Sequence, residues 1–158
     1  MWSYDGRDSI LGARAGSVAL ATAYVEMTSM IVGLGTDVVD CVRIRVILQK
    51  HGERFLERVF TAEERAYCMA KADPVPHLAA RFAAKEAARK AMATEKSLGW
   101  HDVEVVRSAA GSISMRFAGA ATVGAERLNV ARSHVSMTHV KSIAVATVVL
   151  ETDGRGSS

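Results

Sequence analysis

The chain has 158 residues, of which 49% are hydrophobic and 23% charged, and its formal net charge is +3 at pH 7. This length fits one domain, and a chain of this size buries roughly 68–70% of its unfolded surface, enough for a core without disulfide or metal staples. The composition excludes a mainly disordered chain. The charge is mild, and the 6% of aromatic residues are not interleaved with basic ones, which argues against a nucleic-acid binder.

Neither a membrane span nor export is expected. No stretch approaches the ~20 apolar residues that cross a bilayer. Residues 17–25 could be taken for the apolar part of a signal peptide, but the charges before them, such as Asp5 and Arg7, are mixed instead of basic. Cys41 and Cys68 are too few for a disulfide scaffold, so we expect them to pack as small hydrophobes in a cytoplasmic protein.

The first strand pattern marks where we expect the domain to begin. Residues 1–29 mix glycines and scattered charges, whereas an apolar run opens at Met30 and continues through residues 31–35. We expect an N-terminal extension over 1–29, disordered or preceding the native start, a domain over 30–152 and a tail over 153–158. The alternative for the extension is a short regulatory helix over residues 18–27.

The next elements are helical. Residues 42–59 form an amphipathic pattern with a basic polar face, broken near Gly52. Thr61 and Glu64 make a capping box that starts a helix, which must end before Pro74. The alanine-rich segment 77–93 is the strongest helix pattern in the chain.

Strands dominate the last third of the chain. Alternating or β-branched residues predict four strands and one short helix. The strands are expected over residues 103–107, 112–117, 134–138 and 142–150, and the helix over 120–128. Because strands and helices are segregated and do not alternate, the pattern favours the α+β class.

Asp37 is the first residue whose type folding alone does not require. It ends an apolar strand just after Gly33 and Gly35, two residues that let a ligand or another backbone approach closely. The alternative is that Asp37 caps the following turn.

A second charged group lies in the long helix. Glu86 and Lys90 are one turn apart on the same face, as are Arg81 and Lys85. One interpretation is a set of surface ion pairs, each worth roughly a few tenths of a kcal/mol. Neighbouring apolar residues such as Phe82 favour an interior position near Glu86, where a carboxylate needs a partner such as a metal ion.

Three motifs in register resemble those of the holo-acyl-carrier-protein synthases, within the phosphopantetheinyl transferase superfamily. The run from Gly33 to Asp37 followed by Arg43 resembles the opening of that family, and residues 82–91 resemble its F-x-x-K-E-A-x-x-K-A signature. Residues 134–139 resemble the third motif, so the resemblance covers about residues 30–151. It implies a phosphopantetheinyl transferase fold, with a small antiparallel sheet, helices packed against it and a single-domain protomer. It also implies a homotrimer with active sites between subunits.

The resemblance implies transfer of 4′-phosphopantetheine from coenzyme A to a serine of an acyl carrier protein, a step of fatty acid biosynthesis. Asp37 and Glu86 would bind the Mg²⁺, which prefers carboxylates, phosphate oxygens and water in octahedral geometry. Lys90 would offset charge on the departing 3′,5′-ADP, since such transfers depend mostly on positioning and electrostatics. Either Glu86 or a magnesium-bound water would take the serine proton.

The same resemblance implies the other contacts to the substrates. Arg81, Lys85 and His134 would contact the nucleotide or its phosphates. His139 is as well explained by a structural role. The five-residue spacing puts His134 and His139 on opposite faces of one strand, which argues against a zinc site formed by the two.

The partner is expected to be acidic. Acyl carrier proteins of this kind are acidic, so the resemblance makes Arg43 and its neighbours the docking face, and the alternative is a solvated helix with an ordinary charge excess. Positions 43 to 58 contain five basic and two acidic residues. The basic residues are Arg43, Arg45, Lys50, Arg54 and Arg58, and the acidic ones are Glu53 and Glu57.

Two departures from the family pattern keep an alternative function open. Ala93, Thr94 and Glu95 replace a Gly-Thr-Gly turn, and Ser112 replaces a basic residue before a proline. A carboxylate where backbone N–H groups should face a phosphate would weaken coenzyme A binding. The alternative is therefore a non-catalytic module that binds acyl carrier protein and has kept the fold.

Overall fold

The computed structural model describes residues 29–93 and 98–153. The expected extension before Ser29, the regulatory helix over 18–27 and the tail after Asp153 lie outside these residues. The elements are β1 (Met30–Asp40), α2 (Cys41–Val59), α3 (Ala62–Met69), α4 (Val75–Ala91), the 3-10 helix η1 (Trp100–Asp102), β2 (Val103–Arg107), β3 (Ile113–Phe117), α5 (Gly119–Arg127), β4 (Arg132–His139) and β5 (Ile143–Thr152).

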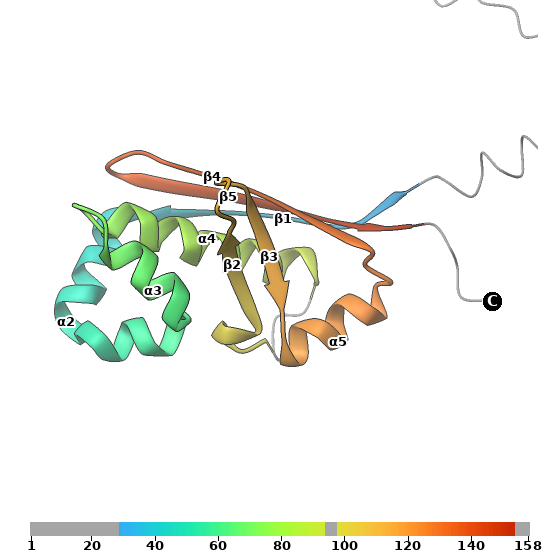
Figure 1. The fold of residues 1–158 in the computed structure, drawn as a ribbon, viewed down its shortest axis with the longest axis horizontal. Helices are drawn as coiled ribbons and strands as arrows, with labels where there is room; N and C mark the ends of the chain where they lie inside the picture. The colour runs from blue at the N-terminus through green and yellow to red at the C-terminus, as the bar shows by residue number, and fades with distance from the viewer. Residues whose placement is uncertain (1–28, 94–97, 154–158) are drawn as a thin grey trace, which may run out of the picture.

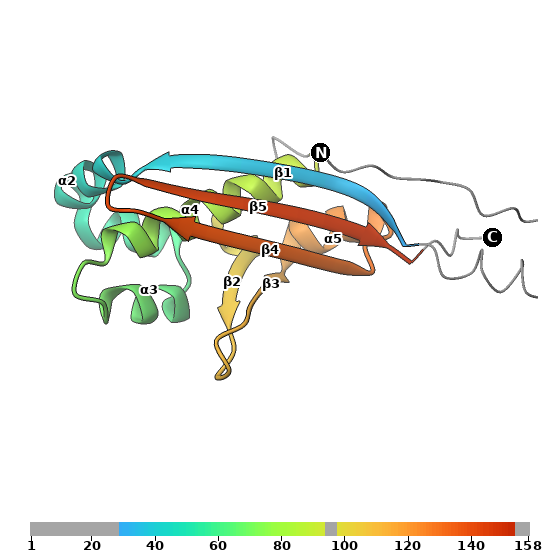
Figure 2. The same ribbon diagram turned by 90° about the horizontal axis from the view of Figure 1, so that it is seen from above.

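A three-stranded antiparallel sheet forms one layer of the molecule. Its strand order is β1-β5-β4, and β2 pairs with β3 in a separate antiparallel hairpin. The helices and the hairpin all lie on one side of the sheet (Figure 1). Seen from above, α4 runs beneath the three strands (Figure 2). Segregated strands and helices of this kind confirm the predicted α+β class.

The core lies between the sheet and α4. Alanines occupy much of the buried side of α4, and Ala144 and Ala146 face it from β5, next to the buried Val148 and Leu150. Small side chains on both surfaces allow the helix axis to approach the sheet closely.

Local signals set the helix boundaries. Asp40 caps α2, with its carboxylate accepting from the Val42 N–H at 2.7 Å, and the predicted break lies at Gly52, whose φ is 51°. The capping box of Thr61 and Glu64 is present at the start of α3. α4 begins two residues earlier than predicted, because Pro76 is tolerated in a first helical turn, where its missing N–H has no partner to lose.

Strand β1 is longer than its apolar pattern. It continues to Asp40, so Asp37 lies inside the strand and not at its end. The cap of the following element is Asp40, which removes the capping alternative for Asp37. Both cysteines are buried and free, as expected.

The other face of the sheet is uncovered. No helix of the described residues packs over it (Figure 1), although Leu34 is 63% exposed, Val38 60% and Ile143 44%. An antiparallel sheet that meets water on one face normally carries polar residues there. Among the residues that the structure describes, no helix is long and apolar enough to cross a membrane.

Candidate active site

The closest approach of β1 and α4 occurs at two glycines. A Cβ on Gly33 would overlap the carbonyl oxygen of Ala91, and a Cβ on Gly35 would overlap that of Ala87. The strand and helix therefore run in opposite directions. Two strand residues cover about 6.6 Å, or about four helical residues, so by the same spacing Asp37 comes level with about Ala83, within one turn of Glu86 along α4.

Asp37 and Lys90 are in direct contact. The Lys90 ammonium donates to Asp37 Oδ1 at 2.8 Å and to the Thr36 carbonyl at 2.8 Å. The Asp37 side chain is 17% exposed. Glu86 lies one turn before Lys90 and is 30% exposed, with Arg89 Nε at 3.7 Å from its carboxylate. The β1–α4 contact thus brings together Asp37 and Lys90, two of the three predicted catalytic residues, and the third, Glu86, lies one helical turn from Lys90.

Asp37 and Glu86 carry the type of ligand that a hard divalent cation takes. No group of three or more His, Cys, Asp or Glu side chains within 29–93 and 98–153 could hold a metal alone. Magnesium is commonly bound by one or two carboxylates, with phosphate oxygens and water filling the other positions. Asp37 and Glu86 would supply that protein share.

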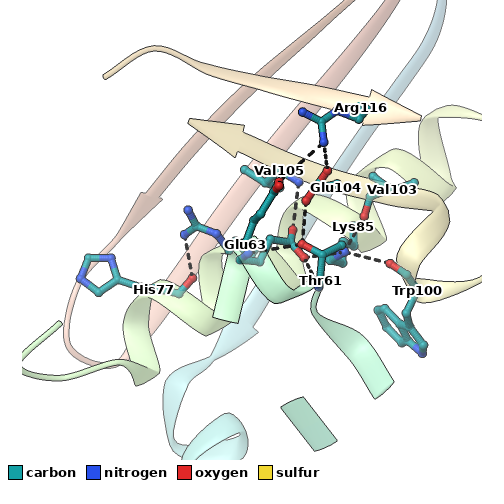
Figure 3. A network of polar contacts seen from close by, with 11 residues as sticks. Thr61, Glu63, His77, Lys85, Trp100, Val103, Glu104, Val105 and Arg116 are labelled. Atoms are coloured by element: carbon teal, nitrogen blue, oxygen red, sulfur yellow. Dashed lines mark hydrogen bonds and ion pairs between the residues drawn. The ribbon is translucent and has the colours of Figure 1, made fainter. Parts of the chain in front are cut away.

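Lys85 is buried, although it belongs to the same motif. Its ammonium lies 2.9 Å from Glu64 Oε2 and donates to the carbonyls of Trp100 and Val103 (Figure 3). Burial lowers the pKa of Lys85, while Glu64 acts in the opposite direction. An ammonium held by three interior acceptors has no N–H left for a phosphate, which is a physical argument against the direct nucleotide contact implied by the resemblance.

Arg81 takes part in a cationic pocket between α3, α4, the hairpin and β4. Its side chain is only 4% exposed, and its guanidinium lies 4.2 Å from the centre of the Tyr67 ring. The buried Nε of Arg81 has no hydrogen-bond partner among the described residues. Arg107 donates to the Tyr67 hydroxyl at 3.1 Å.

Two histidines complete this pocket. His77 and His139 stack edge to face with ring centres 4.7 Å apart, and both line the pocket with Tyr67, Arg81 and Arg107. Burial lowers the pKa of His77, and the nearby His139 adds to the effect. The geometry therefore offers several hydrogen-bond donors and positive charge to an anion.

Sequence reasoning missed Tyr67, His77 and Arg107. They come from three separate segments, and none belongs to a motif. Arg107 at the end of a predicted strand is the only local signal that could have suggested one of them, because a charge at a strand end is free to point into a site.

His134 lies on the uncovered face of the sheet. Its Nε2 is 3.0 Å from Glu151 Oε2 and its side chain is 57% exposed. The register pairs it with Val149, so the sheet separates it from α4 and from Glu86. His139, five residues on, points to the other face, as predicted.

The surface of α2 around Arg43 is basic and partly apolar. Val42 and Val46 beside Arg43 are 60% and 55% exposed. The acids of this helix, Glu53 and Glu57, both pair with Arg65. No ion pair within residues 29–93 and 98–153 involves the helix residues Arg43, Arg54 or Arg58.

Of the two departures from the family pattern, the one at Ser112 lies within the described residues. Thr94 and Glu95 lie outside the described residues. Ser112 is exposed in the hairpin turn, where its hydroxyl pairs with that of Ser108 at 2.7 Å.

Comparisons with known proteins identify the family. Residues 33–148 match the model of the 4′-phosphopantetheinyl transferase superfamily. A holo-[acyl-carrier-protein] synthase of Anaeromyxobacter sp. strain K is 49% identical over 128 residues, covering 79% of this chain and 99% of that protein. The chain belongs to the 4′-phosphopantetheinyl transferase superfamily, and the resemblance found in its motifs is confirmed.

Solved structures agree. The holo-[acyl-carrier-protein] synthase of Neisseria meningitidis is 33% identical, with a TM-score of 0.71, over 78% of this chain and all of that one. The enzyme of Bacillus anthracis in complex with CoA (3′,5′-ADP) is 34% identical, with a TM-score of 0.64, over 78% of this chain and 98% of that one. The phosphopantetheinyl transferase fold is thereby confirmed.

Proposed function

We propose that this protein is a holo-acyl-carrier-protein synthase, which transfers 4′-phosphopantetheine from coenzyme A to a serine of apo-acyl carrier protein and releases 3′,5′-ADP. Its superfamily membership and its close relatives support this activity. The observation that carries it is the contact of Asp37 with Lys90, one turn from Glu86. A non-catalytic binding module is not favoured, because it would have no use for this charged group.

The proposed chemistry is an in-line displacement at phosphorus. The serine Oγ forms a bond to the phosphorus next to pantetheine, the bond to the bridging oxygen breaks, and the electron pair leaves with 3′,5′-ADP. Asp37 and Glu86 would hold Mg²⁺, which would supply charge neutralisation on the phosphates. Lys90 stabilises the departing phosphate, and Glu86 is the side chain that we assign to accept the serine proton.

We assign the nucleotide phosphates of coenzyme A to the pocket around Arg81. A guanidinium with an unpaired buried N–H suits a phosphate oxygen, and His139 adds a donor. Asp37 on β1 and His139 on β4 lie at opposite edges of the sheet, with β5 between them. These two edges are two strand spacings, or about 10 Å, apart. This separation fits an active site that combines Asp37 of one subunit with the phosphate pocket of a neighbouring subunit.

The uncovered sheet face supports a homotrimer built from such subunits. Leu34 and Val38 lie on it beside Val145 and Val149, and burying apolar strands of this kind drives subunit association. His134 on this face would then lie at a subunit boundary, where it could reach a nucleotide held by a neighbour.

The remaining parts of the proposal concern the partner and the setting. Arg43, Arg54 and Arg58, which have no ion-pair partner among the described residues, form the docking face for the acidic carrier protein together with the exposed Val42 and Val46. The activity is assigned to residues 30–152, in line with the near-complete coverage of the relatives. Free, buried cysteines fit a cytoplasmic enzyme of fatty acid biosynthesis.

Replacing either carboxylate should abolish the transfer. Asp37→Asn and Glu86→Gln keep the side-chain shape but weaken cation binding, so kcat should fall by about 100-fold or more. Mass spectrometry of apo carrier protein incubated with coenzyme A and Mg²⁺ measures the added phosphopantetheine. Glu126→Gln on the exposed side of α5 is the matched control, and near-normal turnover in either active-site variant would remove the cation assignment.

Charge reversal at Arg43 should weaken binding of the carrier protein and leave coenzyme A binding unchanged. Arg43→Glu is expected to lower the carrier-protein affinity by about tenfold or more, since it turns attraction into repulsion. Titration calorimetry with each substrate checks both values, with Arg127→Glu on α5 as control. Equal losses for the two substrates would refute the docking face.

The assembly can be tested on the uncovered sheet face. The wild-type protein should show three times the mass of one chain in light scattering, and Leu34→Asp should dissociate it to monomers, because a carboxylate would be buried between chains. Val123→Asp on α5 is the matched control, since Val123 is 65% exposed and Leu34 63%. A wild-type monomer, or an unchanged mass in the Leu34 variant, contradicts the proposal.

A further inference from the structure

The buried pair of Glu64 and Lys85 joins three elements around one strand edge. Both side chains are almost completely buried, at 0% and 1% exposure. Glu64 Oε1 accepts from the Val105 N–H at 2.9 Å, and Lys85 donates to the Val103 carbonyl. Figure 3 shows Lys85 and the residues of β2 meeting in this network.

These contacts take the place of a missing neighbouring strand. Within the described part of the chain, β2 pairs only with β3, and residues two apart along a strand direct their backbone groups to the same edge. The free edge of β2 therefore presents the Val103 carbonyl and the Val105 N–H together. Lys85 and Glu64 satisfy both groups and fix the position of β2 along α3 and α4.

Each residue of this contact is two to four positions in sequence from a residue that lines the cationic pocket. Tyr67 follows Glu64 by three residues on α3, and Arg81 precedes Lys85 by four on α4, so each pair shares a helix face. Arg107 follows Val105 by two residues and ends β2. Tyr67, Arg81 and Arg107 of the cationic pocket thus come from the three elements that the ion pair fixes.

We infer that Lys85 and Glu64 are positioning residues, which set the relative placement of Arg81, Arg107 and Tyr67 for the phosphates of 3′,5′-ADP and of coenzyme A. The inference rests on the proposed assignment of those phosphates to this pocket. Lys85 acts through the hairpin and makes no contact with the nucleotide.

The test compares affinity for 3′,5′-ADP with stability. The double variant Lys85→Met/Glu64→Gln removes both charges at similar volume, a change that buried ion pairs often tolerate in stability. Its Kd for 3′,5′-ADP, measured by titration calorimetry, should rise about tenfold. Its kcat at saturating coenzyme A should stay within about twofold. Leu56→Ala on α2 is the control, because it lowers stability while keeping the Glu64–Lys85 contact, and it should leave Kd unchanged.

A double-mutant cycle with Arg107 separates positioning from a general loss of stability. In an Arg107→Met background, the Lys85→Met/Glu64→Gln change should weaken 3′,5′-ADP binding by less than about twofold, because the pocket residue that β2 carries is absent. If the double variant does not fold, Glu64→Gln alone enters the same cycle. An unchanged Kd in the folded variant, or a full additive effect beside Arg107→Met, overturns the inference.

Arg81→Met distinguishes this inference from the proposed function. If Arg81→Met weakens 3′,5′-ADP binding and the Lys85 and Glu64 changes do not, only the positioning role fails. If Arg81→Met leaves the Kd unchanged, the assignment of the nucleotide phosphates fails, and the positioning role with it.

Discussion

The close contact of β1 with α4 is the constraint on which the candidate site depends. Gly33 and Gly35 allow the strand backbone to touch the helix backbone at Ala91 and Ala87. Any side chain at either glycine would push the helix away and separate Asp37 from Lys90. The site is therefore built from two rigid elements, and its geometry is fixed by backbone packing more than by the charges themselves.

A second constraint acts on another face of α4. There, Glu64 and Lys85 replace the hydrogen bonds of an absent strand and fix the hairpin. Leaving either charge unpaired in this interior would cost about 3–5 kcal/mol of folding free energy, so holding β2 in this way requires both residues. One helix thus carries the carboxylate Glu86 on one side and the pocket residue Arg81 on another, which accounts for the dense motif in its sequence.

The local sequence pattern predicted those features of the fold that local interactions determine. The capping box at Thr61, the break at Gly52 and the alternation in the strands correspond directly to the observed elements, and the spacing of Glu86 and Lys90 placed them on one helix face. Long-range packing decided the rest. Lys85 shares a helix face with Arg81, but only the free edge of β2 makes its position an interior one. Tyr67 and Arg107 meet across 40 residues of chain, and no motif marks such a contact.

Asp37 and Glu86 are proposed to bind one divalent cation together with coenzyme A. Manganese replaces magnesium at such oxygen sites and scatters X-rays anomalously. Crystals grown with coenzyme A and Mn²⁺ should show one anomalous peak, bonded to a carboxylate oxygen of each residue and to a phosphate oxygen. A peak bound elsewhere, or carboxylates that point into separate cavities, would contradict the account.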